Sequence, residues 1–179
     1  MSLFSLLTSY DAYATNRPGA TTVTLAAGRY FFAQKRYLDN SNIPNIALAY
    51  NFNSTWAVEG SVGALNTNQK TRLGGNGVHG FLYTVDALYR FKPKGMFEPY
   101  VALGVGVLGL TPNANNSIQQ GNMNASIGTQ IFFADSIALR GEVKDVYTMS
   151  GGKNDYMLNF GVSILMGGVY GQPEVASFK

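Results

Sequence analysis

A strict alternation of apolar and polar positions runs along most of the chain from Thr22 to Met166. Between residues 81 and 91, for example, Phe81, Tyr83 and Val85 alternate with a second set that includes Asp86. A period of two is that of a β-strand, whose successive side chains point to opposite faces. The pattern therefore predicts seven strands and an earlier, less regular one at about 22–34. The seven lie within residues 45–52, 56–64, 81–91, 100–107, 126–133, 137–144 and 156–164.

The connections between these segments differ in length. Short turns are expected at 53–54, 92–95 and 134–136, and longer polar loops at about 35–44, 66–79, 111–121 and 148–155. Long and short connections would then alternate without exception, as they do in membrane barrels. An even number of strands also places both ends of the barrel domain on the short-turn side. We predict an all-β protein, an eight-stranded antiparallel up-and-down transmembrane β-barrel.

The two faces of the predicted strands carry different side chains. One face is large, apolar and aromatic, while the other holds Gly, Ala, Ser, Asn and the charged residues. The second face has too few charges to form a solvated exterior, and its small residues suit the narrow interior of an eight-stranded barrel. We therefore expect the apolar face to meet lipid. In the first strand we expect Tyr30 and Phe32 on the apolar face and Arg29 inside, with a bulge near 26–28.

Composition narrows the class further. Charged residues make up 13% of the 179 residues, about half of the ~25% usual for soluble domains, and no long apolar run could form a membrane helix. The chain has no cysteine, which excludes disulfides, thiolate metal sites and cysteine nucleophiles. A formal net charge of +3, scattered along the chain, does not favour nucleic acid. We expect no cofactor and no metal.

Charged residues on the predicted inward face must pair, because an unpaired buried charge costs several kcal/mol. We expect a network that joins Glu59 and Glu142 to Arg140, Lys144 and Arg29, with Asp86 and Arg90 pairing to neighbouring strands. Such a network either fixes the register of the strands or acts as a gate that opens when ion-pair partners exchange.

Other candidate sites are weaker. Residues 104–109 match the glycine pattern of dinucleotide sites, but no helix follows, so nucleotide binding is not expected. His79, the single histidine, would need a serine or acid partner to serve a lipid A hydrolase. A basic rim is expected on the long loops, either to contact lipopolysaccharide phosphates or to keep the loops soluble. It comprises Lys35, Arg36, Lys70 and Arg72.

Four segments, which occur in the expected order along the chain, resemble the OmpA-like outer-membrane β-barrel family over about residues 20–168. Residues 56–61 are similar to its third strand, with an inward glutamate, and residues 97–101 with the following Gly-x-Gly repeat to its fifth. Residues 137–143 resemble its seventh strand, where an arginine and a glutamate lie two positions apart. Residues 159–166 resemble the signal read by the barrel-assembly machinery, although Met166 stands where the family usually has an aromatic residue. The signal residues are Asn159, Gly161, Ile164 and Met166.

This resemblance implies a non-enzymatic, monomeric protein of the bacterial outer membrane. It also implies a periplasmic segment at 1–20, a barrel at 21–168 and the start of a periplasmic linker at 169–179. The expected role is a structural anchor that displays four external loops. Such an anchor would support envelope integrity and adhesion and would have weak or no pore activity. Expected partners are outer-membrane lipid, lipopolysaccharide, the assembly machinery and a host-cell receptor. The alternatives are a lipid A-modifying hydrolase and a soluble lipocalin-like carrier.

Overall fold

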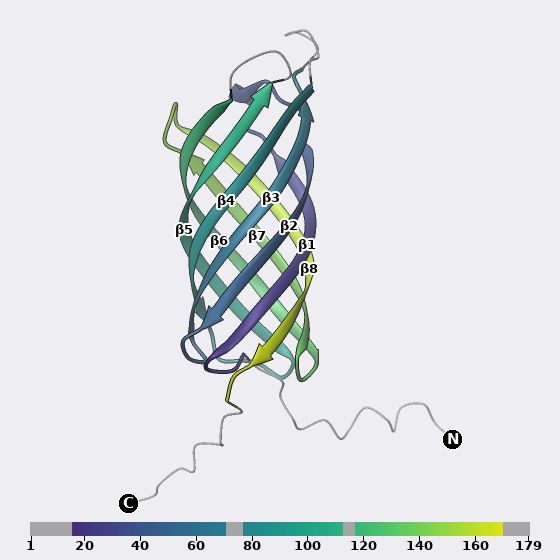
Figure 1. The fold of residues 1–179 in the computed structure, drawn as a ribbon, viewed down its shortest axis with the longest axis vertical. Coiled ribbons are helices and arrows are strands. Elements are labelled where there is room, and N and C mark those ends of the chain that lie inside the picture. Colours follow the sequence, from purple (N-terminus) through teal and green to yellow (C-terminus); the bar gives the residue numbers. More distant parts are fainter. Residues whose placement is uncertain (1–15, 71–76, 113–116, 170–179) are drawn as a thin grey trace, which may run out of the picture.

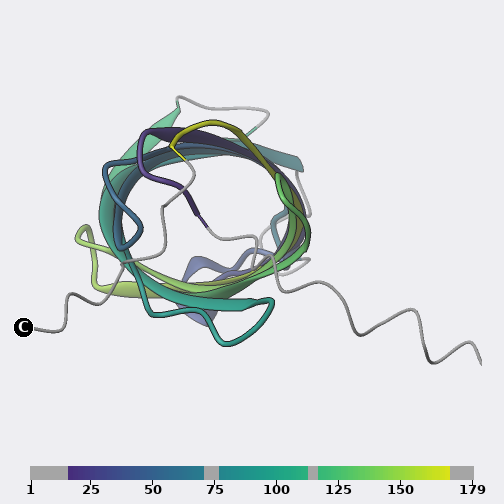
Figure 2. The same ribbon diagram turned by 90° about the horizontal axis from the view of Figure 1, so that it is seen from below.

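Eight antiparallel strands form one closed barrel in the computed structural model, which describes residues 16–70, 77–112 and 117–169 (Figure 1). Each strand pairs with the next, and β1 pairs with β8 to close the ring, as Figure 2 shows. A short 3-10 helix, η2 (Gln34–Arg36), follows β1. Among the described residues, no helix is long and apolar enough to cross a membrane. The strands are β1 (Ala20–Phe31), β2 (Ser41–Asn51), β3 (Trp56–Asn68), β4 (Gly77–Arg90), β5 (Phe97–Pro112), β6 (Ile118–Ala134), β7 (Ile137–Thr148) and β8 (Lys153–Gly167).

The two ends of the barrel carry different parts of the chain. β1 begins and β8 ends at the same end, which we call the terminal end (Figure 1). The connections that follow β1, β3, β5 and β7 lie at the opposite, distal end. The expected alternation of loop lengths was wrong in part, because the distal connections 113–117 and 149–152 are shorter than the turn 91–96. The hydrogen bonds between paired strands join backbone groups only. Polar segments such as residues 118–121 can therefore extend the strands where loops were expected.

The barrel has its apolar face outside, as the alternation predicted. Tyr50, Val105 and Phe160 are 47%, 57% and 64% exposed, while Glu59 and Arg140 are buried in the interior. In water such a surface would be a single large apolar patch. The outer wall is therefore built to contact hydrocarbon, and the interpretation as a soluble carrier was wrong.

The register predicted for the first strand was wrong. Tyr30 and Phe32 point into the barrel, and Arg29 lies on the outer wall, where its Nη1 donates to Asn42 Oδ1 at 3.2 Å. No bulge interrupts β1, which pairs continuously with β2 and β8. Gly28 explains the register: a Cβ added there would lie 2.1 Å from the backbone oxygen of Leu158, so this inward position accepts only glycine. Tyr30, two residues on, must then point inward as well.

Aromatic rings form a chain on the outer wall near the terminal end. Trp56 contacts Tyr89 edge-on with ring centroids 5.0 Å apart, and Tyr89 contacts Phe91 in the same way at 5.2 Å. Aromatic residues of this kind favour the boundary between hydrocarbon and headgroups. This chain therefore marks one edge of the membrane-facing band.

Candidate functional site: a closed lumen

Among the residues that the structure describes, ten buried charged side chains face the lumen or its rims, five of each sign. The balance matters because a narrow interior cannot hydrate unmatched charge. It leaves the lumen without a net charge that would favour anions or cations. The cations are Arg17, Arg36, Arg90, Arg140 and Lys144, and the carboxylates are Glu59, Asp86, Glu98, Glu142 and Asp155.

Arg140, on β7, is the centre of the middle layer of the lumen. Its guanidinium reaches across to β3, where Nη1 and Nη2 donate to the two carboxylate oxygens of Glu59, the second at 2.8 Å. Nη2 also donates to Glu142 Oε2 at 2.6 Å, and Nε donates to the hydroxyl of Tyr100 at 2.6 Å. That hydroxyl in turn donates to Glu142 Oε2 at 2.7 Å. This paired geometry is the strong, directional form of an arginine–carboxylate contact.

Lys144 extends the same layer towards β4. Its Nζ donates to Asp86 Oδ2 at 2.7 Å and lies 3.7 Å from Glu142 Oε1. Asp86 Oδ2 also accepts from Thr84, whose hydroxyl is 2.8 Å from that of Ser61. The structure thus brings together five of the predicted lumen residues, from β3, β4 and β7. They are Glu59, Asp86, Arg140, Glu142 and Lys144.

Glycines on neighbouring strands make the room for this layer. A Cβ added at Gly104 would lie 1.9 Å from Asp86 Oδ1, and one at Gly128 would lie 2.4 Å from the Tyr100 hydroxyl. The polar groups therefore occupy space that any other residue would fill. The Gly-x-Gly pattern of β5 serves lumen packing, in agreement with the rejection of a nucleotide site.

Arg90 and Glu98 belong to a separate layer near the terminal end. Both are buried, and in the described part of the chain Arg90 forms no ion pair, while Glu98 Oε2 accepts from Asn16 Nδ2 at 2.7 Å. Asn16 also donates to Gln130 Oε1 at 2.6 Å and is 1% exposed. Residues 16–19, which directly precede β1, therefore lie across the terminal opening of the barrel (Figure 2). Sequence reasoning missed this, because alternation says nothing about residues outside the strands.

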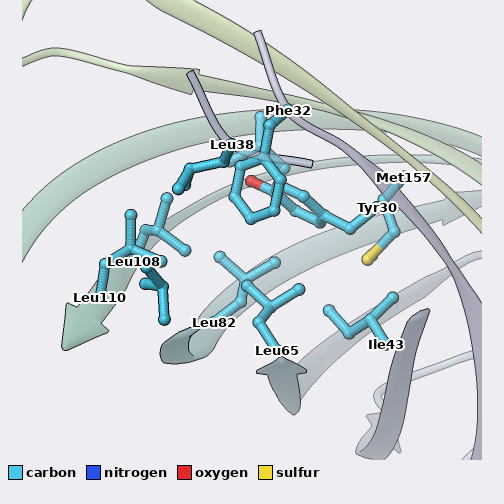
Figure 3. Close-up of a cluster of buried hydrophobic side chains, with 11 residues drawn as sticks. Tyr30, Phe32, Leu38, Ile43, Leu65, Leu82, Leu108, Leu110 and Met157 are labelled. Atoms are coloured by element: carbon cyan, nitrogen blue, oxygen red, sulfur yellow. The ribbon is translucent and has the colours of Figure 1, made fainter. Parts of the chain in front are cut away.

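An apolar cluster fills the distal part of the lumen (Figure 3). It gathers buried side chains from seven strands and from the first distal connection, and two of its rings, Tyr30 and Phe32, have centroids 4.7 Å apart. The small, polar lumen expected from the sequence therefore does not extend into the distal part of the barrel. The cluster comprises Tyr30, Phe32, Leu38, Ile43, Leu65, Val78, Leu82, Leu108, Leu110, Val146 and Met157.

A further ion pair, separate from the Arg140 network, lies beside this cluster at the distal rim. The Arg36 guanidinium donates from Nε to Asp155 at 2.9 Å and also contacts Gln120 and Thr148. Asp155 further accepts from the hydroxyl of Tyr30 at 3.0 Å. Sequence reasoning missed Asp155. The available signal was the alternation of β8, which places Asp155 on the inward face near the distal end of that strand.

Only part of the predicted basic rim is exposed on the distal connections. Lys35 and Lys70 are exposed, but the Arg36 side chain is 3% exposed and turned inward, because it pairs with Asp155. Arg72 lies outside the described residues. The first two distal connections are tied together, since Lys70 N donates to Tyr37 O at 2.9 Å and Leu38 bridges to Gln69.

The remaining predicted residues lie on the wall of the barrel. In β8, Asn159 and Gly161 face the lumen while Ile164 and Met166 are exposed outside. His79 is on the outer wall, with Nδ1 2.6 Å from Asn66 Oδ1. No group of residues that could hold a metal ion occurs in the described ranges. The predicted periplasmic segment and linker lie largely outside the described residues.

A closed eight-stranded barrel with an apolar exterior and an ion-paired lumen defines the class of outer-membrane barrel proteins. The sequence matches the model of the OprF membrane domain over residues 2–170, so the chain belongs to that family. No curated protein sequence matches it. As a member of this family, the protein is a bacterial outer-membrane barrel, and the family and its fold neighbours are non-enzymatic.

Solved structures share this fold at low sequence identity. The N-terminal barrel domain of Pseudomonas aeruginosa OprF is 19% identical, with a TM-score of 0.65 over 84% of this chain and 100% of that one. Neisserial surface protein A is 11% identical, with a TM-score of 0.66 over 83% and 98%. Ail, the attachment invasion locus protein of Yersinia pestis, is 14% identical, with a TM-score of 0.60 over 83% and 99%. At these identities the likeness establishes the fold alone.

Proposed function

We propose that the protein is a structural anchor of the outer membrane that carries its distal connections outside the cell and conducts few or no ions. The buried side chains that fill the lumen are the observation that supports this proposal most strongly. Three layers fill it in series: the distal apolar cluster, the Arg140 network and the terminal layer around Asn16. A continuous water path would have to cross all three.

The orientation can be tested by labelling intact cells. The chain has no cysteine, so Lys35→Cys introduces a single thiol at an exposed distal position. A maleimide that cannot cross the membrane is expected to label it in intact cells. Asn53→Cys, in the exposed turn 52–55 at the terminal end, is the matched control and should react only after the cells are lysed. The reverse pattern would refute the proposed orientation.

The ion network also suggests a gate as a second candidate function. Arg140 already contacts both Glu59 and Glu142, and Lys144 lies between Asp86 and Glu142, so partners can exchange through small movements. Planar-bilayer recordings on Arg140→Ala separate the two functions. The anchor function predicts the conductance of the wild type, whereas a clear increase would favour the gate.

Adhesion is a further aspect of the anchor proposal. The tied distal connections form a cavity of about 330 Å³ beside exposed Lys70, lined also by Gln34, Asp39 and Asn40. Exposed loops on a rigid scaffold commonly carry binding sites, and Ail, which shares the fold, is named as an attachment invasion locus protein. We propose that this surface contacts acidic groups on host cells or in lipopolysaccharide. The double variant Lys35→Glu/Lys70→Glu should then reduce cell attachment, and unchanged attachment would argue against it.

The last strand, β8, is the basis for a proposal about the partner that assembles the barrel. This strand closes the barrel against β1, and its Gly161 packs tightly there, since an added Cβ would lie 2.5 Å from Leu25 O. We propose that the pattern from Asn159 to Met166 is read by the barrel-assembly machinery. Gly161→Val should accordingly reduce the folded protein recovered from outer membranes more than Gly121→Val, at an open position on β6.

A further inference from the structure

A small cavity lies at the distal rim, between the first two distal connections. It measures about 330 Å³, at the lower end of the range typical of small-molecule sites. Its apolar lining includes Phe32 and Leu38, which belong to the buried cluster and are labelled in Figure 3. The ring of Phe31, which is 39% exposed, completes this part of the wall. The cavity therefore rests on side chains that packing inside the barrel already holds in place.

Backbone hydrogen bonds hold the two connections in this arrangement. Tyr37 adopts a left-handed conformation with a φ of 54°, which is uncommon for a residue with a side chain and is found most often at functional sites. Beyond it, Asp39 N donates to Asn68 O at 3.0 Å, and the hydroxyl of Thr67 donates to Asp39 O. Lys70 N donates to Tyr37 O at 2.9 Å. These contacts fix the shape of the cavity without using the polar side chains that line it.

The polar side chains of the lining are exposed and have no partner among the residues that the structure describes. Asp39 and Lys70 carry opposite charges and line the same cavity, yet no ion pair joins them there. The amides of Gln34 and Asn40 likewise make no side-chain hydrogen bond within the described ranges. Binding surfaces are complementary in charge to what they bind. A cavity that presents one free charge of each sign is therefore suited to a zwitterion.

The rest of the lining narrows the choice of zwitterion. A primary ammonium is strongly hydrated and would lose its water against Phe31 and Leu38. A quaternary ammonium carries methyl groups instead, and it favours aromatic and apolar walls beside a carboxylate. The other side of the cavity offers three donors, from Lys70 and the two amides, which match the three oxygens of a phosphate better than the two of a carboxylate.

We propose that this distal cavity binds phosphocholine, with the trimethylammonium group between Asp39 and Phe31 and the phosphate on Lys70. The proposal deepens the adhesive role given above, because it names the acidic group and adds a cation to it. It also rests on the outward orientation of the distal end, since only then can the cavity reach phosphocholine headgroups on another cell. A purely anionic ligand fits less well, because it would lie beside the carboxylate of Asp39.

Titration calorimetry on the refolded protein tests the cavity directly. The detergent is a non-ionic maltoside, because a choline detergent would compete. Phosphocholine, inorganic phosphate, choline and phosphoethanolamine are titrated separately. Asp39→Asn and Lys70→Gln each remove one charge with little change of size. Lys35→Gln is the matched control, because Lys35 is exposed at the same rim but does not line the cavity. Heat-modifiable migration on gels shows that each variant is folded.

The wild type and Lys35→Gln are expected to bind phosphocholine equally, and Asp39→Asn and Lys70→Gln at least about tenfold more weakly, because each loses a charged contact. The wild type should also prefer phosphocholine to the three other ligands by at least about tenfold. Undetectable binding of phosphocholine, equal binding of inorganic phosphate or phosphoethanolamine, or an equal loss in Lys35→Gln would overturn the proposal.

A second arm uses intact cells that carry the protein. They are expected to attach to phosphatidylcholine bilayers in preference to phosphatidylglycerol bilayers, and free phosphocholine should compete. Binding in detergent without attachment of cells would support the cavity and refute its adhesive role. The labelling of Lys35→Cys tests the orientation separately, so failure of the anchor proposal can be told from failure of this one.

Discussion

At the scale of single residues, Arg140 carries the most contacts in the lumen. It makes hydrogen bonds to Glu59, Glu142 and Tyr100, and its guanidinium carbon lies 4.9 Å from the centre of the Tyr100 ring. Removing it leaves two carboxylates buried without their main cation. Breaking a buried pair in this way typically costs about 3–5 kcal/mol.

We therefore expect Arg140→Ala to lower the free energy of unfolding by about 3–5 kcal/mol, measured by urea unfolding in lipid vesicles. Arg29→Ala is the matched control, because Arg29 is exposed and makes a single hydrogen bond, to Asn42. It should cost less than about 1 kcal/mol. Equal losses in the two variants would show that the network contributes little to stability.

At the scale of elements, β5 shows how a strand combines two kinds of glycine. Gly104 faces the lumen, where an added Cβ would lie 2.4 Å from Val85 O, while Gly109 faces outward and its Cβ would be 3.8 Å from Phe81 O. We expect Gly104→Ala to destabilise the barrel by about 1–3 kcal/mol. Gly109→Ala should leave the urea midpoint nearly unchanged. A larger loss at Gly109 would contradict the assignment of faces in β5.

The alternation along the chain was sufficient to predict the elements, since the strands and their outward faces follow from the period of two. It could not define β1, where Ala26, Ala27 and Gly28 give no contrast between the faces. Glycine is required at position 28 by the close approach of the Leu158 backbone, far along the chain on β8. Five network residues were predicted because they alternate regularly. The terminal layer around Asn16 was not predicted, because it depends on where residues outside the strands lie relative to the barrel opening.

At the scale of the whole molecule, the anchor proposal predicts that the lumen acts as three barriers in series, and ion flow through barriers in series is limited by the most resistive one. Arg140→Ala alone leaves the distal apolar cluster, in which Leu82 and Leu108 are 3% and 0% exposed. An apolar constriction excludes ions by staying dry. Removal of one layer should therefore leave conductance at the level of the wild type.

Opening the barrel should require changes in two layers at once. We expect Leu82→Ser/Leu108→Ser to conduct no better than the wild type, because the Arg140 network still closes the middle of the lumen. Combining these two changes with Arg140→Ala should give clear single-channel steps in planar bilayers, since the terminal layer around Asn16 rests on a few hydrogen bonds from one segment. If the triple variant folds, by its heat-modifiable migration, and stays closed, the terminal layer is the limiting barrier. Adding Asn16→Ala should then open the pore, and a closed quadruple variant would contradict the arrangement of layers described above.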